Sequence, residues 1–184
     1  MDRMSASRSP PPHARAGFTL VEMLMTMAVM TVLVGIALPS FKGFVQQQRT
    51  TTAMHLLSSH LAHARLSAIH QRSVVMICPS DGNGKCRSDG DWSGEWMAFT
   101  DRDGNRQPDT AADILRVERP SLDGAMRIVS GPARPSVRYL PDGRSAGSNL
   151  TVRICRNAEL LGSVIVNNVG RVRSRRAETG EACG

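Results

Sequence analysis

A long apolar run dominates the first quarter of the chain. From Phe18 to Leu38 the only charged residue is Glu22. These 21 residues are close to the ~20 that a helix needs to cross the hydrocarbon core of a bilayer. Pro39 follows, which favours a kink or local melting where the helix leaves the bilayer. The pattern therefore predicts a transmembrane helix over residues 18–41.

Beyond this run the pattern becomes amphipathic, which predicts a continuation of the helix over residues 42–72. Apolar residues recur at alternating steps of three and four, at Met54, Leu57, Leu61, Ala64 and Ala68. This stripe requires a partner surface. The opposite side is expected to face solvent or a filament, and it carries Gln46, Gln47, Arg49, Thr51, Ser58 and Arg65.

After Ser73 the pattern changes to short β runs separated by Gly, Pro and Asp clusters. A helix followed by many short strands predicts an α+β fold, in which an antiparallel β-sheet packs on the apolar stripe. This globular domain is assigned to residues 73–169. Residues 170–184 are expected to form an irregular basic tail. The strands are expected at Val74–Cys78, Glu95–Thr100, Ile114–Glu118, Met126–Val129, Val137–Leu140, Leu150–Cys155 and Gly162–Val166.

The distribution of charge predicts the orientation of the chain in the membrane and the class of its binding partners. Residues 1–17 contain three arginines and one aspartate but no apolar stretch, unlike a conventional secretory signal. The positive-inside bias keeps this leader cytoplasmic and places the domain on the other side of the membrane. The formal net charge is +7, so an exported domain has nucleic acid, anionic lipid or acidic polysaccharide as candidate partners.

Four cysteines lie on the exported side, where disulfides persist. Of the three possible connectivities we favour Cys78 with Cys86, which flank a Gly-rich turn, and Cys155 with Cys183, which would tie the tail to a strand. A zinc site is the alternative, although no two cysteines have the short C-x-x-C spacing.

The segment from Ala16 to Leu24, AGFTLVEML, resembles the start of a type IV prepilin. The resemblance implies that a prepilin peptidase cuts between Gly17 and Phe18 and that the new amine of Phe18 is methylated. It also implies that Glu22 pairs with the amine of a neighbouring pilin during assembly. The protein would begin as a single-pass inner-membrane protein with a periplasmic domain and then enter a pilus or pseudopilus at the cell surface. An ordinary membrane anchor is the alternative.

The domain resembles the FimT/GspH family of minor pilins and pseudopilins. The resemblance rests on residues Val74–Pro79, Trp92–Asp101, Asp103–Asn105 and Ile114–Arg116. Gly170 to Arg173 reads G-R-V-R and matches the G-R-x-R motif of the FimT proteins. The resemblance implies that Arg171 and Arg173 contact DNA, while charge alone adds Arg175 and Arg176.

The function implied is that of a minor type IV pilin that binds extracellular double-stranded DNA without sequence preference for natural transformation. The tail has no aromatic residue for base stacking, which favours backbone contacts. Arg144, Arg153 and Arg156 would enlarge the basic patch if their strands lie beside the tail. The alternatives are a solvated tail on a structural pseudopilin of type II secretion, or on a minor pilin that primes assembly.

Other motifs have simpler explanations. Asp101 to Asp109 resembles the start of a calcium loop, but a turn stabilised by Asx side chains accounts for the same residues. His60 and His63 could share a helix face, as metal ligands or as ordinary helix residues. Trp92 and Trp96 are expected in the core rather than on a carbohydrate-binding surface. No catalytic motif or cofactor motif is present, so we expect neither an enzyme nor a bound cofactor.

Overall fold

The computed structural model describes residues 17–184, so the three leader arginines lie outside the described residues. One helix, α1, spans Leu20–Gln71. The Thr19 hydroxyl accepts a hydrogen bond from the Glu22 amide at 3.2 Å and caps the first turn. The helix continues through Pro39, so the melting expected there is not seen. A proline removes a single backbone donor, and here the acceptor deprived of it is the carbonyl of Gly35.

The described chain forms two compact units, which divide after Phe44. The first contains the apolar part of α1, a helix long and apolar enough to span a membrane. The second, Val45–Gly184, contains every residue of the buried core and all four cysteines. A fragment of residues 45–184 is therefore a self-contained folding unit.

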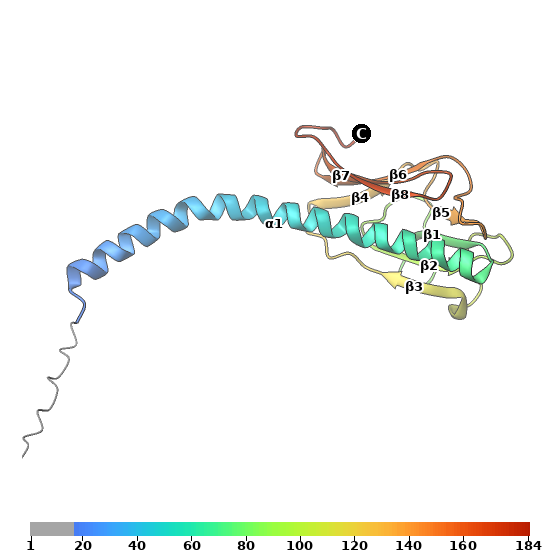
Figure 1. The fold of residues 1–184 in the computed structure, drawn as a ribbon, viewed down its shortest axis with the longest axis horizontal. Helices are drawn as coiled ribbons and strands as arrows, with labels where there is room; N and C mark the ends of the chain where they lie inside the picture. The colour runs from blue at the N-terminus through green and yellow to red at the C-terminus, as the bar shows by residue number, and fades with distance from the viewer. Residues whose placement is uncertain (1–16) are drawn as a thin grey trace, which may run out of the picture. The chain divides into compact units, whose positions relative to one another are not determined.

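Beyond α1, the second unit contains eight strands in two four-stranded antiparallel sheets, and one short 3-10 helix, η1, at Ala111–Asp113. Sheet A has the order β3-β2-β1-β5 and sheet B the order β4-β6-β7-β8 (Figure 1). The α+β architecture is as predicted, with two sheets on the helix. The strand bounds are β1 Val75–Ser80, β2 Glu95–Thr100, β3 Ile114–Glu118, β4 Met126–Ser130, β5 Val137–Tyr139, β6 Leu150–Arg156, β7 Glu159–Val166 and β8 Val172–Arg176.

The apolar stripe of α1 is the centre of the core, as the spacing predicted. Leu57, Leu61, Ala64 and Ala68 are fully buried, and they share one cluster with side chains from both sheets. Ile77 comes from β1 in sheet A, and Val152 and Val164 come from β6 and β7 in sheet B. Burial of one helical stripe by two sheets is what holds the three layers together.

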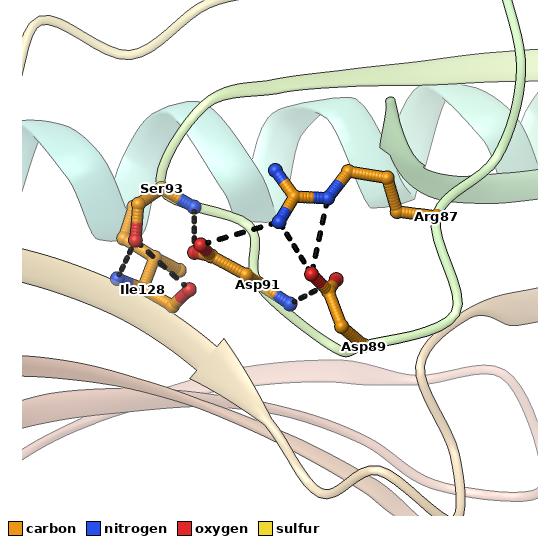
Figure 2. Close-up of polar contacts among 5 residues, drawn as sticks. All are labelled: Arg87, Asp89, Asp91, Ser93 and Ile128. Atoms are coloured by element: carbon orange, nitrogen blue, oxygen red, sulfur yellow. Dashed lines mark hydrogen bonds and ion pairs between the residues drawn. The ribbon is translucent and has the colours of Figure 1, made fainter. Parts of the chain in front are cut away.

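The loop between β1 and β2 crosses from sheet A to the edge of sheet B. The Trp92 amide donates to the Ile128 carbonyl at 2.8 Å, and the Ser93 hydroxyl accepts from the Ile128 amide at 2.9 Å. Figure 2 shows Arg87 bridging Asp89 and Asp91 within this loop. These contacts cover the β4 edge of sheet B, so the free edge of that sheet is β8.

The carboxyl-terminal segment corrects the prediction of an irregular tail. Residues Val172–Arg176 form β8, which pairs with β7 from Val166↔Val172 to Gly162↔Arg176. The chain then returns along the start of β7, where the Leu160 amide donates to the Glu181 carbonyl at 2.8 Å. Backbone hydrogen bonds to a neighbouring strand order this polar segment without requiring apolar burial.

The additional strand, β8, also contacts a side of α1 that was expected to be solvated. Ser58 shares a hydrogen bond of 2.8 Å with Ser174 of β8, and Thr51 accepts one of 3.3 Å from Arg176. Arg49 forms an ion pair with Asp123 at 3.0 Å. This side of the helix therefore contacts sheet B and its loops.

Candidate nucleic-acid interface

A tight turn built around Gly170 leads from β7 into β8. Gly170 has a φ of +79°, and a Cβ at this position would lie 2.0 Å from the Gly143 carbonyl oxygen. Only glycine combines this left-handed backbone with so close an approach. The Asn167 side chain accepts a hydrogen bond of 2.8 Å from the Arg171 amide. The glycine of the G-R-x-R motif thus determines the turn that positions the Arg171 backbone.

Arg65 of α1 holds the same turn from beneath. Its Nε donates to the Gly143 carbonyl at 2.9 Å and its Nη2 donates to the Val169 carbonyl at 3.1 Å. The prediction that Arg65 faces solvent or a filament is wrong, because the 140–145 and 167–171 turns bring their carbonyl groups to it. Helical periodicity gave no signal for these contacts, which join residues far apart in the sequence.

The two faces of β8 have different roles, because successive side chains of a strand point to opposite faces. Val172 packs against the core, and Ser174 and Arg176 contact α1. Arg173 and Arg175 consequently lie on the opposite face of sheet B, which we call the outer face. Both of these arginines are exposed.

The four predicted arginines differ in what their guanidinium groups contact. Arg175 forms two hydrogen bonds with Glu181, at 3.1 and 2.6 Å. This contact lowers the pKa of the Glu181 carboxyl and raises that of Arg175. Arg176 donates to Thr51. Within residues 17–184, the exposed guanidinium groups of Arg171 and Arg173 have no ion pair or side-chain hydrogen bond. These two are the arginines available to a ligand.

Arginines on neighbouring strands add positive charge to the outer face of sheet B, although not all of the predicted ones do. Arg153 pairs with Ser163, which pairs with Arg175 across β6, β7 and β8, so Arg153 shares the outer face. Arg127 of β4 lies on this face too and is exposed, although no motif or pattern in the sequence singled it out. Arg156 is bound to Asp123, and Arg144 to Asp142 at 2.6 Å, so neither adds a free charge. Of the three arginines that were expected to enlarge the patch, the structure brings in only Arg153.

The second unit offers no aromatic side chain for base stacking. Its four aromatic residues are all fully buried, namely Trp92, Trp96, Phe99 and Tyr139. Burial of both tryptophans confirms their prediction as core residues. The charged groups that remain on the outer face are guanidinium groups, which suit phosphate oxygens.

The four cysteines are bonded in the two favoured pairs. Cys78 is bonded to Cys86 with a Cα–Cα distance of 5.6 Å, and Cys155 is bonded to Cys183 with a Cα–Cα distance of 5.9 Å. The second bond joins β6 to the returning segment and holds Glu181 near Arg175. It therefore contributes to the geometry of the outer face.

The remaining candidate sites have structural explanations. In the 101–109 loop, Asp103 accepts a hydrogen bond from the Asn105 amide at 3.1 Å, an Asx turn as expected. His60 is fully buried beside Trp96, with ring centroids 6.4 Å apart, whereas His63 is exposed. No group of three His, Cys, Asp or Glu residues that could hold a metal ion occurs in the described part of the chain.

The amino-terminal candidates lie in the first unit. Phe18 is exposed, and Glu22 lies in the first turn of α1. A carboxylate there interacts favourably with the helix dipole.

Comparison with known proteins supports the architecture. A family model described as "Type II transport protein GspH" matches residues 53–170, and one described as "Prokaryotic N-terminal methylation motif" matches residues 12–38. Two crystal forms of the type IV minor pilin FimU of Pseudomonas aeruginosa are similar in fold. One has a TM-score of 0.57 at 18% identity over 76% of this chain and 96% of FimU. The other has a TM-score of 0.53 at 18% identity over 72% and 95%. No curated protein matches the chain.

Proposed function

The chain belongs to the GspH family of minor pilins and pseudopilins, and from this premise we propose that it binds double-stranded DNA through the outer face of sheet B. The observation that carries the proposal is the pair Arg171 and Arg173, two exposed guanidinium groups without a partner in residues 17–184. Arg153 and Arg127 on the same face add positive charge beside them.

The binding would depend on phosphate groups and not on base sequence. Guanidinium forks form bidentate contacts with phosphate oxygens, and no exposed aromatic group of the second unit competes for bases. Two to three neutralised phosphates give a slope of log affinity against log salt of about −1.8 to −2.7 for duplex DNA. So small a number of contacts predicts weak binding at physiological salt, and capture would require several copies.

The experiment compares DNA retardation by fragment 45–184 with that of two double variants. Arg171→Gln with Arg173→Gln should nearly abolish retardation while the circular dichroism spectrum is unchanged, because both side chains are exposed. Arg72→Gln with Lys85→Gln removes the same charge from exposed residues elsewhere and should leave most of the retardation. Equal retardation by both double variants would contradict the proposal. In a competent host, the first variant should lower transformation with pilus number unchanged.

A second candidate is a purely structural role, either as a pseudopilin of type II secretion or as a minor pilin that primes pilus assembly. The description of the matching family model as a type II transport protein favours it. In that case the outer face would contact neighbouring subunits. Fragment 45–184 would then fail to retard DNA, and loss of the chain would impair secretion or piliation.

Both candidates share one route to the filament, which we include in the proposal. A prepilin peptidase would cleave between Gly17 and Phe18, the Phe18 amine would be methylated, and Glu22 would pair with the amine of a neighbouring pilin. The apolar part of α1 would hold the chain in the inner membrane before assembly, with the second unit in the periplasm. In both cases the partners would be major and minor pilins, and DNA would be a ligand only under the first candidate.

A further inference from the structure

A cavity at the end of sheet A gathers three arginines from two separate segments. It has a volume of about 360 Å³ and is lined by Arg106, Arg134 and Arg138, together with Ser136 and Ser148. Its lining contains no acidic side chain. The cavity involves loops around β5 and not the outer face of sheet B, so it is separate from the proposed DNA interface.

Arg134 is held in place yet keeps an unused donor. Its Nη2 donates to the Ser145 hydroxyl at 2.8 Å and to the Ala146 carbonyl at 2.7 Å. Its Nη1 is buried and has no hydrogen-bond partner in residues 17–184. Burial lowers the pKa of this guanidinium, which still carries its charge at neutral pH. A buried cationic donor without a partner is costly, so an anion here would stabilise the fold.

Arg138 has the same unsatisfied character. Its Nε is buried and has no hydrogen-bond partner among the described residues. The carboxylate beside it belongs to Asp101, whose Oδ2 lies 3.9 Å from this Nε, beyond hydrogen-bond distance. The other oxygen of Asp101 accepts from the Arg106 amide at 3.2 Å. Asp101 is thus at ion-pair distance from one of the three guanidinium groups, that of Arg138.

Arg106 is placed at the cavity by an unusual backbone conformation. Its φ is +67°, in the left-handed region that residues other than glycine rarely adopt. Such strained positions persist where the surrounding structure enforces them, and they are common at ligand sites. The Asp101 carboxylate enforces this one through its hydrogen bond to the Arg106 amide.

We propose that this cavity binds a small molecule through an oxyanion group, a phosphate or a carboxylate, which the Arg134 and Arg138 guanidinium groups contact and Arg106 covers. The volume lies in the range of small-molecule sites, which favours a compact ligand over a flat polymer contact. The Arg134 and Arg138 side chains both line the cavity, and guanidinium groups suit the oxygens of phosphate and carboxylate.

Calorimetry on the full chain in a non-ionic detergent tests the proposal with inorganic phosphate, citrate and glucose 6-phosphate, and with glucose as the uncharged control. We expect saturable binding of one oxyanion per chain and none of glucose. Comparison of phosphate with citrate identifies the preferred group. The double variant of Arg171 and Arg173 should bind as the unaltered chain does, so this result is independent of DNA binding.

Two variants address the cavity and one serves as their control. Arg134→Gln should weaken binding by about tenfold or more, the effect of losing one charged hydrogen-bonding group. Ser148→Asp adds a carboxylate at an exposed lining residue without removing any described contact, and it should abolish binding even if Arg134→Gln fails to fold. Arg127→Gln removes a charge from sheet B and should have no effect. Absence of saturable oxyanion binding, or equal binding in Ser148→Asp and Arg127→Gln, would overturn the proposal.

Discussion

Arg175 and Glu181 form a bidentate ion pair, with Nη1 3.1 Å from Oε2 and Nη2 2.6 Å from Oε1. The pair joins β8 to the returning carboxyl-terminal segment. It occupies the guanidinium fork that would otherwise face a phosphate. The acidic residue six positions after Arg175 thus limits how much of the arginine cluster is available to DNA.

Replacement of Glu181 by Gln should therefore increase DNA binding. The released Arg175 can neutralise one more phosphate, so the salt slope should become steeper by about 0.9 and the affinity at low salt should rise severalfold. Fluorescence anisotropy with a labelled duplex measures both quantities. Glu159→Gln removes the same charge from an exposed residue without an ion pair in the described chain, and should change the slope little. Identical behaviour of the two variants would mean that Arg175 is not held by Glu181.

Replacement of Gly170 by Ala should destabilise the turn before Arg171. The added Cβ would meet the Gly143 carbonyl oxygen, so we expect a loss of at least about 2 kcal/mol in urea unfolding of fragment 45–184. Gly180 has a φ of +82° with nothing within 4 Å of its Cβ, so Gly180→Ala reports the backbone strain alone. That control should cost about 1 kcal/mol. A Gly170→Ala loss no larger than the Gly180→Ala loss would refute the close approach.

Burial lowers the pKa of His60 to about 4, with smaller contributions from Arg116 and His63. The unfolded chain then binds the proton more strongly than the folded chain does. Stability should fall by about 2 kcal/mol from about pH 7 to about pH 5, and this loss is complete only near the folded pKa. His60→Leu should flatten this part of the profile in urea titrations, whereas His55→Leu on the exposed side of α1 should not. An unchanged slope in His60→Leu would assign the pH dependence to other groups.

Glu22 is proposed to act in assembly, because a carboxylate in a membrane segment is costly without a partner. Glu22→Ala should insert into the membrane normally but enter filaments about tenfold less or worse, the effect of losing ~1.4 kcal/mol of interaction. Cross-linking to neighbouring pilins in sheared filaments measures this, with Met25→Ala as the control. Normal incorporation of Glu22→Ala would remove the assembly role.

The sequence predicted the helix stripe from its helical spacing, and seven of the eight strands because they are short β runs between Gly, Pro and Asp clusters. It missed β8 because Val172 is the only apolar residue in that strand and its order comes from backbone pairing with β7. It missed the contacts of Arg65, since helical spacing cannot show which distant carbonyl groups reach a side chain. The motif already distinguished Arg171 and Arg173 from Arg175 and Arg176, but only the structure shows that Arg175 is bound to Glu181 and Arg176 to Thr51.

The salt dependence of DNA binding by fragment 45–184 tests the central claim most directly. We predict a slope of about −1.8 to −2.7 for the unaltered fragment, from two to three phosphates. The double change of Arg171 and Arg173 to Gln should bring the slope about 1.8 closer to zero, while the matched change of Arg72 and Lys85 leaves it unaltered. The same slope in both double variants would contradict the account and leave the chain a structural subunit.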